Sequence, residues 1–161
     1  MPHSSKDPQE QFQAVETLLI EWLKERRALL TRYTALVVDL DGSPSADGLR
    51  RRQLDLCALL VDYISAGHFE VFHQIIEEAE SFGDSSGGLV AELMPAISDT
   101  TEVILAYEEK YTGSEEVSDK LSRDLSALGE ILESRFLLED RLIAGLHNKH
   151  RRLVAAPAHS A

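Results

Sequence analysis

The segment TALVVDLDGSPSADG (residues 34–48) holds the residues that most directly invite a catalytic interpretation. A β-branched run followed by Asp-Leu-Asp-Gly is typical of phosphatases in which the first aspartate is the nucleophile and the second the acid and base. That chemistry requires Asp39 at the carboxyl end of a parallel strand. The apolar residues of this region instead recur every three to four positions, so VVDL is predicted to be the last turn of a long helix and DGSPSADG the loop after it. We therefore assign Asp39 no catalytic role.

Histidines at helical spacing raise two other kinds of chemistry, metal binding and phosphotransfer. Glu70 and His73 form a Glu-x-x-His pair, but di-iron bundles need two such pairs and two further glutamates. His147 and His150 lie in a basic helix end that we expect to fray. His68 falls at a predicted helix start, where the helix dipole disfavours a protonated ring. A metal-binding or phosphotransfer bundle stays as the alternative, while we predict no enzyme, no cofactor and no metal site.

Charge and composition narrow the possible partners of this chain. The chain of 161 residues carries a net charge of −12, with 16 lysines and arginines against 28 aspartates and glutamates. Such a chain repels phosphates, so we expect a basic partner and no direct contact with nucleic acid. The single cysteine, Cys57, agrees with a reducing compartment. Because no apolar run is long enough for a bilayer, we predict a cytoplasmic protein with no membrane contact.

The elements that position these residues are all predicted to be helices. Apolar residues at a spacing of three to four predict helices over about residues 12–40, 47–65, 68–82, 90–111 and 117–149. A tight corner is expected at residues 65–67, and Pro95 is expected to kink or restart its helix. The predicted fold is an all-α antiparallel bundle, with a four-helix core of long helices and a short extra helix. Residues 1–150 form its single domain, and residues 151–161 form a disordered tail.

Two charged residues interrupt the apolar stripe of the last helix. Arg135 and Glu139 lie one turn apart on that stripe, and buried charges are costly unless they are paired. One interpretation is a buried pair of these two side chains, supplemented by Tyr63 or Asp62 from a neighbouring helix. The other is a groove in which a partner docks. The helical spacing alone leaves both open.

Two long motifs connect the chain to a known family. LLVDYISAGHFEVFHQI (residues 59–75) and LGEILESRFLLEDRLI (residues 128–143) resemble the regulator-of-sigma-D family of transcriptional regulators. EWLKERRALL (residues 21–30) resembles the first-helix segment of that family, although Glu21 stands where the family has a basic residue. With the same order of helices, the resemblance covers roughly residues 18–146.

The resemblance implies an anti-sigma factor. Members of this family bind the housekeeping sigma factor of RNA polymerase, chiefly its C-terminal domain, a basic helix-turn-helix module that reads the −35 element. Occupying that domain blocks both promoter recognition and contact with the core enzyme. We expect this chain to do the same, as a monomer when bound; contact with a second sigma domain stays open.

The resemblance also implies which residues meet the partner. The predicted partner-binding residues are Asp62, His68, Glu133, Arg135, Glu139, Asp140 and Trp22. Of these, Trp22 is either a core residue or an interface anchor. Gly67 is expected to supply the geometry of the corner, and Phe69 and Phe136 are expected in the core.

Overall fold

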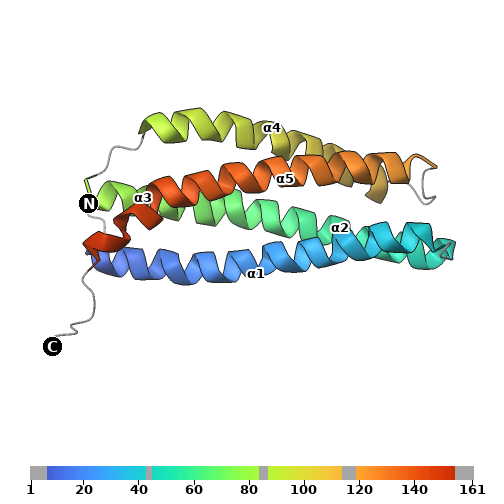
Figure 1. Ribbon diagram of the computed structural model, residues 1–161, viewed down its shortest axis with the longest axis horizontal. Helices are drawn as coiled ribbons and strands as arrows, with labels where there is room; N and C mark the ends of the chain where they lie inside the picture. Colours follow the sequence, from blue (N-terminus) through green and yellow to red (C-terminus); the bar gives the residue numbers. More distant parts are fainter. Residues whose placement is uncertain (1–6, 43–44, 84–86, 114–118, 155–161) are drawn as a thin grey trace.

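The computed structural model describes residues 7–42, 45–83, 87–113 and 119–154, all of it helices and turns without a strand. The elements are α1 (Pro8–Asp41), α2 (Ala46–Ala66), the π-helix η1 (Gly67–Val71), α3 (Phe72–Ser81), α4 (Gly87–Thr112), α5 (Leu121–Leu146) and the 3-10 helix η2 (Asn148–Leu153). The long helices lie side by side, and neighbours along the chain run in opposite directions (Figure 1). The predicted all-α antiparallel bundle is confirmed.

Helix α1 shows why these segments are helical and which face they bury. The Asp7 side chain accepts a hydrogen bond from the Gln9 N–H (3.0 Å), and Pro8 occupies the first position of the helix, where its missing N–H costs nothing. One apolar face then faces the core, through Phe12, Val15, Leu19, Trp22, Leu29 and Leu36. The helix ends before Gly42, and Asp39 lies in its last turn, paired with Arg52 of α2. The interpretation of Asp39 as part of a helix end is confirmed.

The predicted corner at residues 65–67 is wrong. Gly67 has helical dihedral angles (φ −60°, ψ −52°), and α2, η1 and α3 follow one another without a break (Figure 1). The Phe72 N–H bonds to the Gly67 carbonyl, which is the five-residue step of a π-turn. The short extra helix is therefore the continuation of the second long helix.

Close packing explains the glycine at this position better than turn geometry does. A Cβ atom on Gly67 would lie only 2.8 Å from Cζ2 of Trp22. The glycine thus lets the indole of α1 lie directly against the backbone of η1. This contact needs the absence of a side chain and no unusual φ.

Two further boundaries differ from prediction. Helix α4 continues through Pro95 from Gly87 to Thr112 without restarting. Helix α5 ends at Leu146, earlier than predicted, and Arg151–Leu153 belong to η2 where a disordered tail is predicted. The remainder of that predicted tail, residues 155–161, lies outside the described residues.

Candidate functional site

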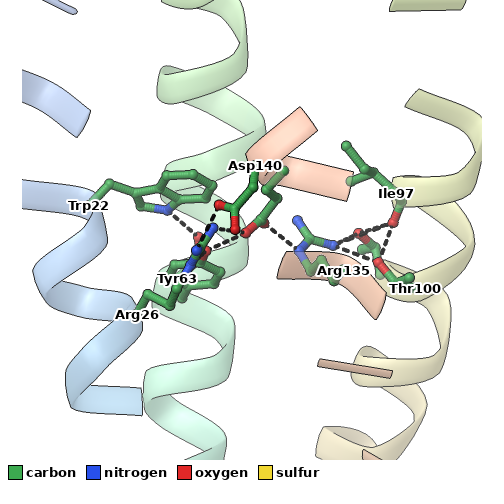
Figure 2. Close-up of polar contacts among 9 residues, drawn as sticks. Trp22, Arg26, Tyr63, Ile97, Thr100, Arg135 and Asp140 are labelled. Carbon is green, nitrogen blue, oxygen red and sulfur yellow. Dashed lines mark hydrogen bonds and ion pairs between the residues drawn. The ribbon is translucent and has the colours of Figure 1, made fainter. Parts of the chain in front are cut away.

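The buried charges of α5 form the centre of a polar network in the bundle core. Arg135 is 1% exposed and Glu139 is completely buried. Arg135 Nε donates to Glu139 Oε2 at 2.8 Å, one helical turn away (Figure 2). The interpretation as a buried pair is confirmed. This network, which we call the Glu139 network, also includes Trp22, Arg26, Tyr63, Thr100, Thr101 and Asp140.

Groups from α1 and α2 complete the coordination of Glu139. The Tyr63 hydroxyl donates to Glu139 Oε1, and Arg26 Nη2 donates to the same oxygen at 3.0 Å. Arg26 also donates from Nε to the Tyr63 hydroxyl (3.1 Å) and from Nη1 to Asp140 Oδ1 (2.8 Å). Burial raises the pKa of Glu139, while the two guanidinium groups and the Tyr63 hydroxyl oppose that rise. Three donors satisfy this carboxylate, which fits an ionised form.

Arg135 extends the same network to α4. Its Nη1 donates to Thr101 Oγ1 (2.6 Å), to Thr100 Oγ1 (3.1 Å) and to the Ile97 carbonyl (3.4 Å) (Figure 2). The network therefore joins α1, α2, α4 and α5. A buried network of this kind stabilises the bundle only while each member keeps its partners.

Trp22 is a core residue, so its predicted role as an interface anchor is not available to it in this fold. The indole is 1% exposed, its Nε1 donates to the Tyr63 carbonyl at 3.1 Å, and its ring stacks on the Tyr63 ring at 4.7 Å. Phe136, predicted in the core, is half-buried and lies under the Arg26 guanidinium at 4.6 Å.

Four of the predicted partner-binding residues reach the surface: Asp62, His68, Glu133 and Asp140. Phe69, predicted in the core, is 77% exposed, and this prediction is wrong. In the same segment Val71 and Phe72 are buried, so Phe69 lies on the opposite, outer face of η1. Tyr63 or Asp62 was predicted to supplement the Arg135–Glu139 pair. Tyr63 does so through its hydroxyl, and Asp62 makes no hydrogen bond or ion pair with the network among the described residues.

The predicted helix start before His68 is also wrong, because η1 continues from α2. The imidazole is exposed in the middle of a continuous helix, a position that phosphotransfer requires. That chemistry also needs a lysine close by. Residues 46–81 contain none, and Lys24 of the neighbouring α1 is paired with Glu21 at 3.1 Å. The Glu70–His73 pair is exposed as well, and His73 Nε2 lies 3.4 Å from Glu77 Oε2. Among the residues that the structure describes, no group of three histidine, cysteine or acidic side chains is arranged to hold a metal ion.

Four exposed carboxylates gather where α1 meets α2 and η1. Glu21 and Glu25 come from α1, Asp62 from α2 and Glu70 from η1. The pKa of Glu25 is raised by partial burial and then by the negative charges of the other three, so the four groups share one region of the surface. We call these four side chains the acidic patch.

Two features of the structure were not predicted from the sequence: the role of Arg26 and a second buried polar group. Arg26 follows Trp22 by one helical turn on the buried stripe of α1, the same signal that identified Arg135. The second group surrounds Glu78, which is completely buried. His147 Nδ1 lies 2.5 Å from Glu78 Oε1, and its Nε2 lies 2.7 Å from Glu16 Oε1. The expectation that this end of the chain frays is therefore wrong: His147 and His150 are buried.

Comparison with known proteins agrees with the resemblance in the motifs. Residues 1–147 match the family described as "Regulator of RNA polymerase sigma(70) subunit, Rsd/AlgQ". A protein named "Regulator of sigma D" from Yersinia pseudotuberculosis serotype O:1b (strain IP 31758) is 35% identical over 130 residues, which cover 78% of this chain and 77% of that protein. The protein of the same name from Salmonella paratyphi B (strain ATCC BAA-1250 / SPB7) is 37% identical over 132 residues, covering 78% of this chain and 79% of its own length.

No solved structure matches this chain. Within the described part of the chain, none of the helices has an apolar stretch of the length that a bilayer crossing requires. The family is one of regulatory proteins, and its description names the sigma(70) subunit. On the extent of these matches, the chain belongs to the Rsd/AlgQ family of regulators of the RNA polymerase sigma(70) subunit.

Proposed function

We propose that this protein is an anti-sigma factor that binds the C-terminal, −35-reading domain of the housekeeping sigma factor. Binding there keeps sigma from promoter DNA and from the core enzyme. The observation that carries the proposal is the acidic patch, two of whose members, Asp62 and Glu70, lie in the first family motif together with the exposed Phe69.

Charge complementarity supports this choice of partner. A domain that reads DNA presents arginines and lysines to phosphates, and the four carboxylates of the acidic patch offer those cations an alternative anion. Phe69 is 77% exposed and supplies the large apolar side chain that interface centres favour. Asp62 and His68 lie on this docking face, so we assign them to direct contact.

The buried members of the predicted set have a supporting role in this proposal. Trp22, Arg135 and Glu139 hold α1, α2, α4 and α5 in register below the docking face. Glu133 and Asp140 line a different groove, between α1 and α5, together with Leu137, which is 62% exposed. That groove is the competing location for the docking site.

Equilibrium binding to the isolated C-terminal domain of the sigma factor separates the two faces. We expect Phe69→Ala to weaken binding by about tenfold or more, because hot-spot aromatics typically contribute ≥ ~2 kcal/mol. Leu137→Ala is the matched control, since it truncates another exposed apolar side chain outside the proposed face. If Leu137→Ala weakens binding and Phe69→Ala does not, the docking site lies in the α1–α5 groove. If wild-type protein does not retain the domain at all, the proposed function is wrong.

Association rates give a second test of the same proposal. Steering by the acidic patch predicts that the on-rate falls as ionic strength rises, since salt screens the attraction between the two surfaces. Replacing Glu21 and Glu70 together with glutamine should flatten that dependence. An on-rate that is independent of salt in the wild-type protein would contradict electrostatic steering.

A further inference from the structure

A pocket with a cavity volume of about 250 Å³ lies between α2, η1 and α4, above the side chain of Arg135. Its walls are mostly apolar, with Ile64, Phe72, Met94 and Ile97 among them. The volume is just below the ~300–1,000 Å³ of sites for drug-sized ligands. We call this cavity the Arg135 pocket.

One nitrogen of Arg135 is not used by the Glu139 network. Nε donates to Glu139, and Nη1 donates to Thr100, Thr101 and Ile97. Nη2 makes no hydrogen bond with any described residue, and Figure 2 shows it without a dashed line, turned away from the other contacts. Arg135 lines the pocket and its side chain is 1% exposed, so Nη2 can be reached only from the cavity. A ligand oxygen in the cavity could accept a charge-assisted hydrogen bond from it.

The charge of the pocket wall differs from that of the chain as a whole. The chain has a net charge of −12 and 28 acidic residues, yet none of the described residues that line the pocket is an aspartate or glutamate. The charged or titratable side chains that line it are Arg135 and, at the exposed edge, His68. Ser65, Ser98 and Thr101 add hydroxyl groups. An apolar cavity with a cation at its base and no carboxylate in its wall favours a small amphipathic anion.

We infer that the Arg135 pocket binds a small monocarboxylate with an apolar body, whose carboxylate accepts from Nη2 of Arg135. The apolar part lies against Ile64, Phe72 and Met94. Among the described residues, none of the four carboxylates of the acidic patch lines this pocket, whereas Phe69 and His68 of the proposed docking face do. The inference rests on the pocket and on Arg135 and does not depend on the proposed function.

Methionine NMR tests this site with hexanoate as the probe. The chain has two methionines, Met1 and Met94, and only Met94 lines the pocket among the described residues. In protein labelled at the methionine methyl carbons, hexanoate should shift the Met94 signal saturably and leave the Met1 signal unchanged. Hexanamide, which has the same length without charge, should bind about tenfold more weakly or worse, because charge-assisted hydrogen bonds are the stronger ones.

Two variants locate the bound probe. Ser98→Phe places a ring at the edge of the pocket and should abolish the Met94 shift, whereas Ser126→Phe, at an exposed serine of α5 outside the pocket, should not. Arg135→Lys keeps a cation for Glu139 but removes Nη2, and should weaken hexanoate binding about tenfold. If Arg135→Lys does not fold, the comparison of Ser98→Phe with Ser126→Phe still tests whether hexanoate binds in the pocket. A shift that does not saturate, equal affinity for hexanoate and hexanamide, or binding that survives Ser98→Phe would overturn the inference.

Discussion

Two buried glutamates, Glu139 and Glu78, show two ways in which this bundle keeps a carboxylate in its core. Glu139 accepts from Arg135, Arg26 and Tyr63, and both of its oxygens are bonded. Among the described residues, the Glu78 carboxylate has a hydrogen-bond partner at Oε1, which is His147, and none at Oε2. His150 Nδ1 lies 3.8 Å from that second oxygen, within ion-pair range but beyond hydrogen-bond range.

The difference lies in the chemistry of the partners. Arginine stays charged at every accessible pH, so the charge balance around Glu139 is permanent. An imidazole offers two ring nitrogens where a guanidinium offers five N–H donors, so the histidines around Glu78 supply fewer hydrogen bonds than the arginines around Glu139. The first arrangement suits a structural core, and the second suits the attachment of the chain end, η2, to α1 and α3.

Both partners of Glu78 are held by more than charge. The His147 ring stacks on Phe12 at 4.1 Å and the His150 ring on Phe82 at 4.8 Å. Glu16 bonds His147 and also pairs with Arg151 of η2 at 2.9 Å. We call these residues (Glu16, Glu78, His147, His150 and Arg151) the Glu78 cluster.

The largest effect is expected in the Glu139 network. Arg135→Ala leaves the fully buried Glu139 without its closest cation, so the free energy of unfolding should fall by about 3–5 kcal/mol. Urea unfolding measures this loss. The double variant Arg135→Met with Glu139→Leu removes both charges and should recover much of it. If Arg135→Ala alone is neutral, Arg26 by itself satisfies Glu139 and the two arginines are redundant.

A somewhat smaller loss is expected in the Glu78 cluster. His147→Ala removes the one hydrogen bond that the described residues make to the Glu78 carboxylate, and the free energy of unfolding at pH 7 should fall by about 2–3 kcal/mol. The pKa values of both Glu78 and Glu139 are raised by burial. This variant, like Arg135→Ala, should therefore lose less stability at a pH where the carboxyl takes up a proton, because a neutral carboxyl is easier to bury. Urea unfolding of both variants at pH 7 and pH 5 provides the comparison. The same loss at both values would show that the cluster does not respond to pH.

Acid should affect Glu16 and Glu78 of this cluster in opposite directions. Hydrogen bonding to Arg151, followed by His147 and opposed by partial burial, lowers the pKa of Glu16 from 4.5 to about 2. Its contribution to stability is therefore present above about pH 5 and is lost as the pH falls toward 2. Burial instead raises the pKa of Glu78, so its ionisation weakens the fold as the pH rises above 4.5.

Glu16→Gln isolates the first of these effects. The stability difference between wild type and Glu16→Gln should be largest near pH 6 and should shrink as the pH falls below 5. Thermal unfolding from pH 6 down to pH 3 measures it. Asp124→Asn is the matched control, since the pKa of Asp124 is also lowered to about 2 but by Lys110, Tyr111 and Arg123, outside the cluster. A difference that stays constant with pH would show that Glu16 acts through packing alone.

The smallest effect on stability is expected at the surface. Asp62→Ala removes an exposed carboxylate that belongs to neither buried group, so the free energy of unfolding should change by less than about 0.5 kcal/mol. Its affinity for the sigma C-terminal domain should nevertheless fall by about 1–3 kcal/mol if it meets an arginine in the proposed complex. If Asp62→Ala unfolds the protein while Arg135→Ala affects only sigma binding, the structural and docking roles are reversed.

The buried charges show what helical spacing predicts well. Arg135 and Glu139 interrupt an apolar stripe one turn apart, and their spacing alone places them on the same face of one helix. Arg26 carries the same signal on α1, so it was predictable by the same reasoning. Their contact with Tyr63, which brings three helices together, could not be predicted in this way. Spacing fixes the buried face of each helix but does not fix how the helices pack together.

The sequence by itself determined the helical class, the buried stripes, the placement of Arg135 and Glu139 on one helix face and the family motifs, because each is local or periodic along the chain. That Arg135 and Glu139 form a buried pair was decided by the tertiary structure. Only the tertiary structure decided that Gly67 is helical, that Phe69 is exposed and that His147 is buried. Gly67 is glycine because Trp22 of another helix packs against it at a distance that leaves no room for a Cβ. His147 lies in a basic chain end and is buried because Glu16 and Glu78, 131 and 69 residues away in sequence, converge on its ring. Contacts of that separation depend on how the helices pack, and the pattern within any one helix does not contain them.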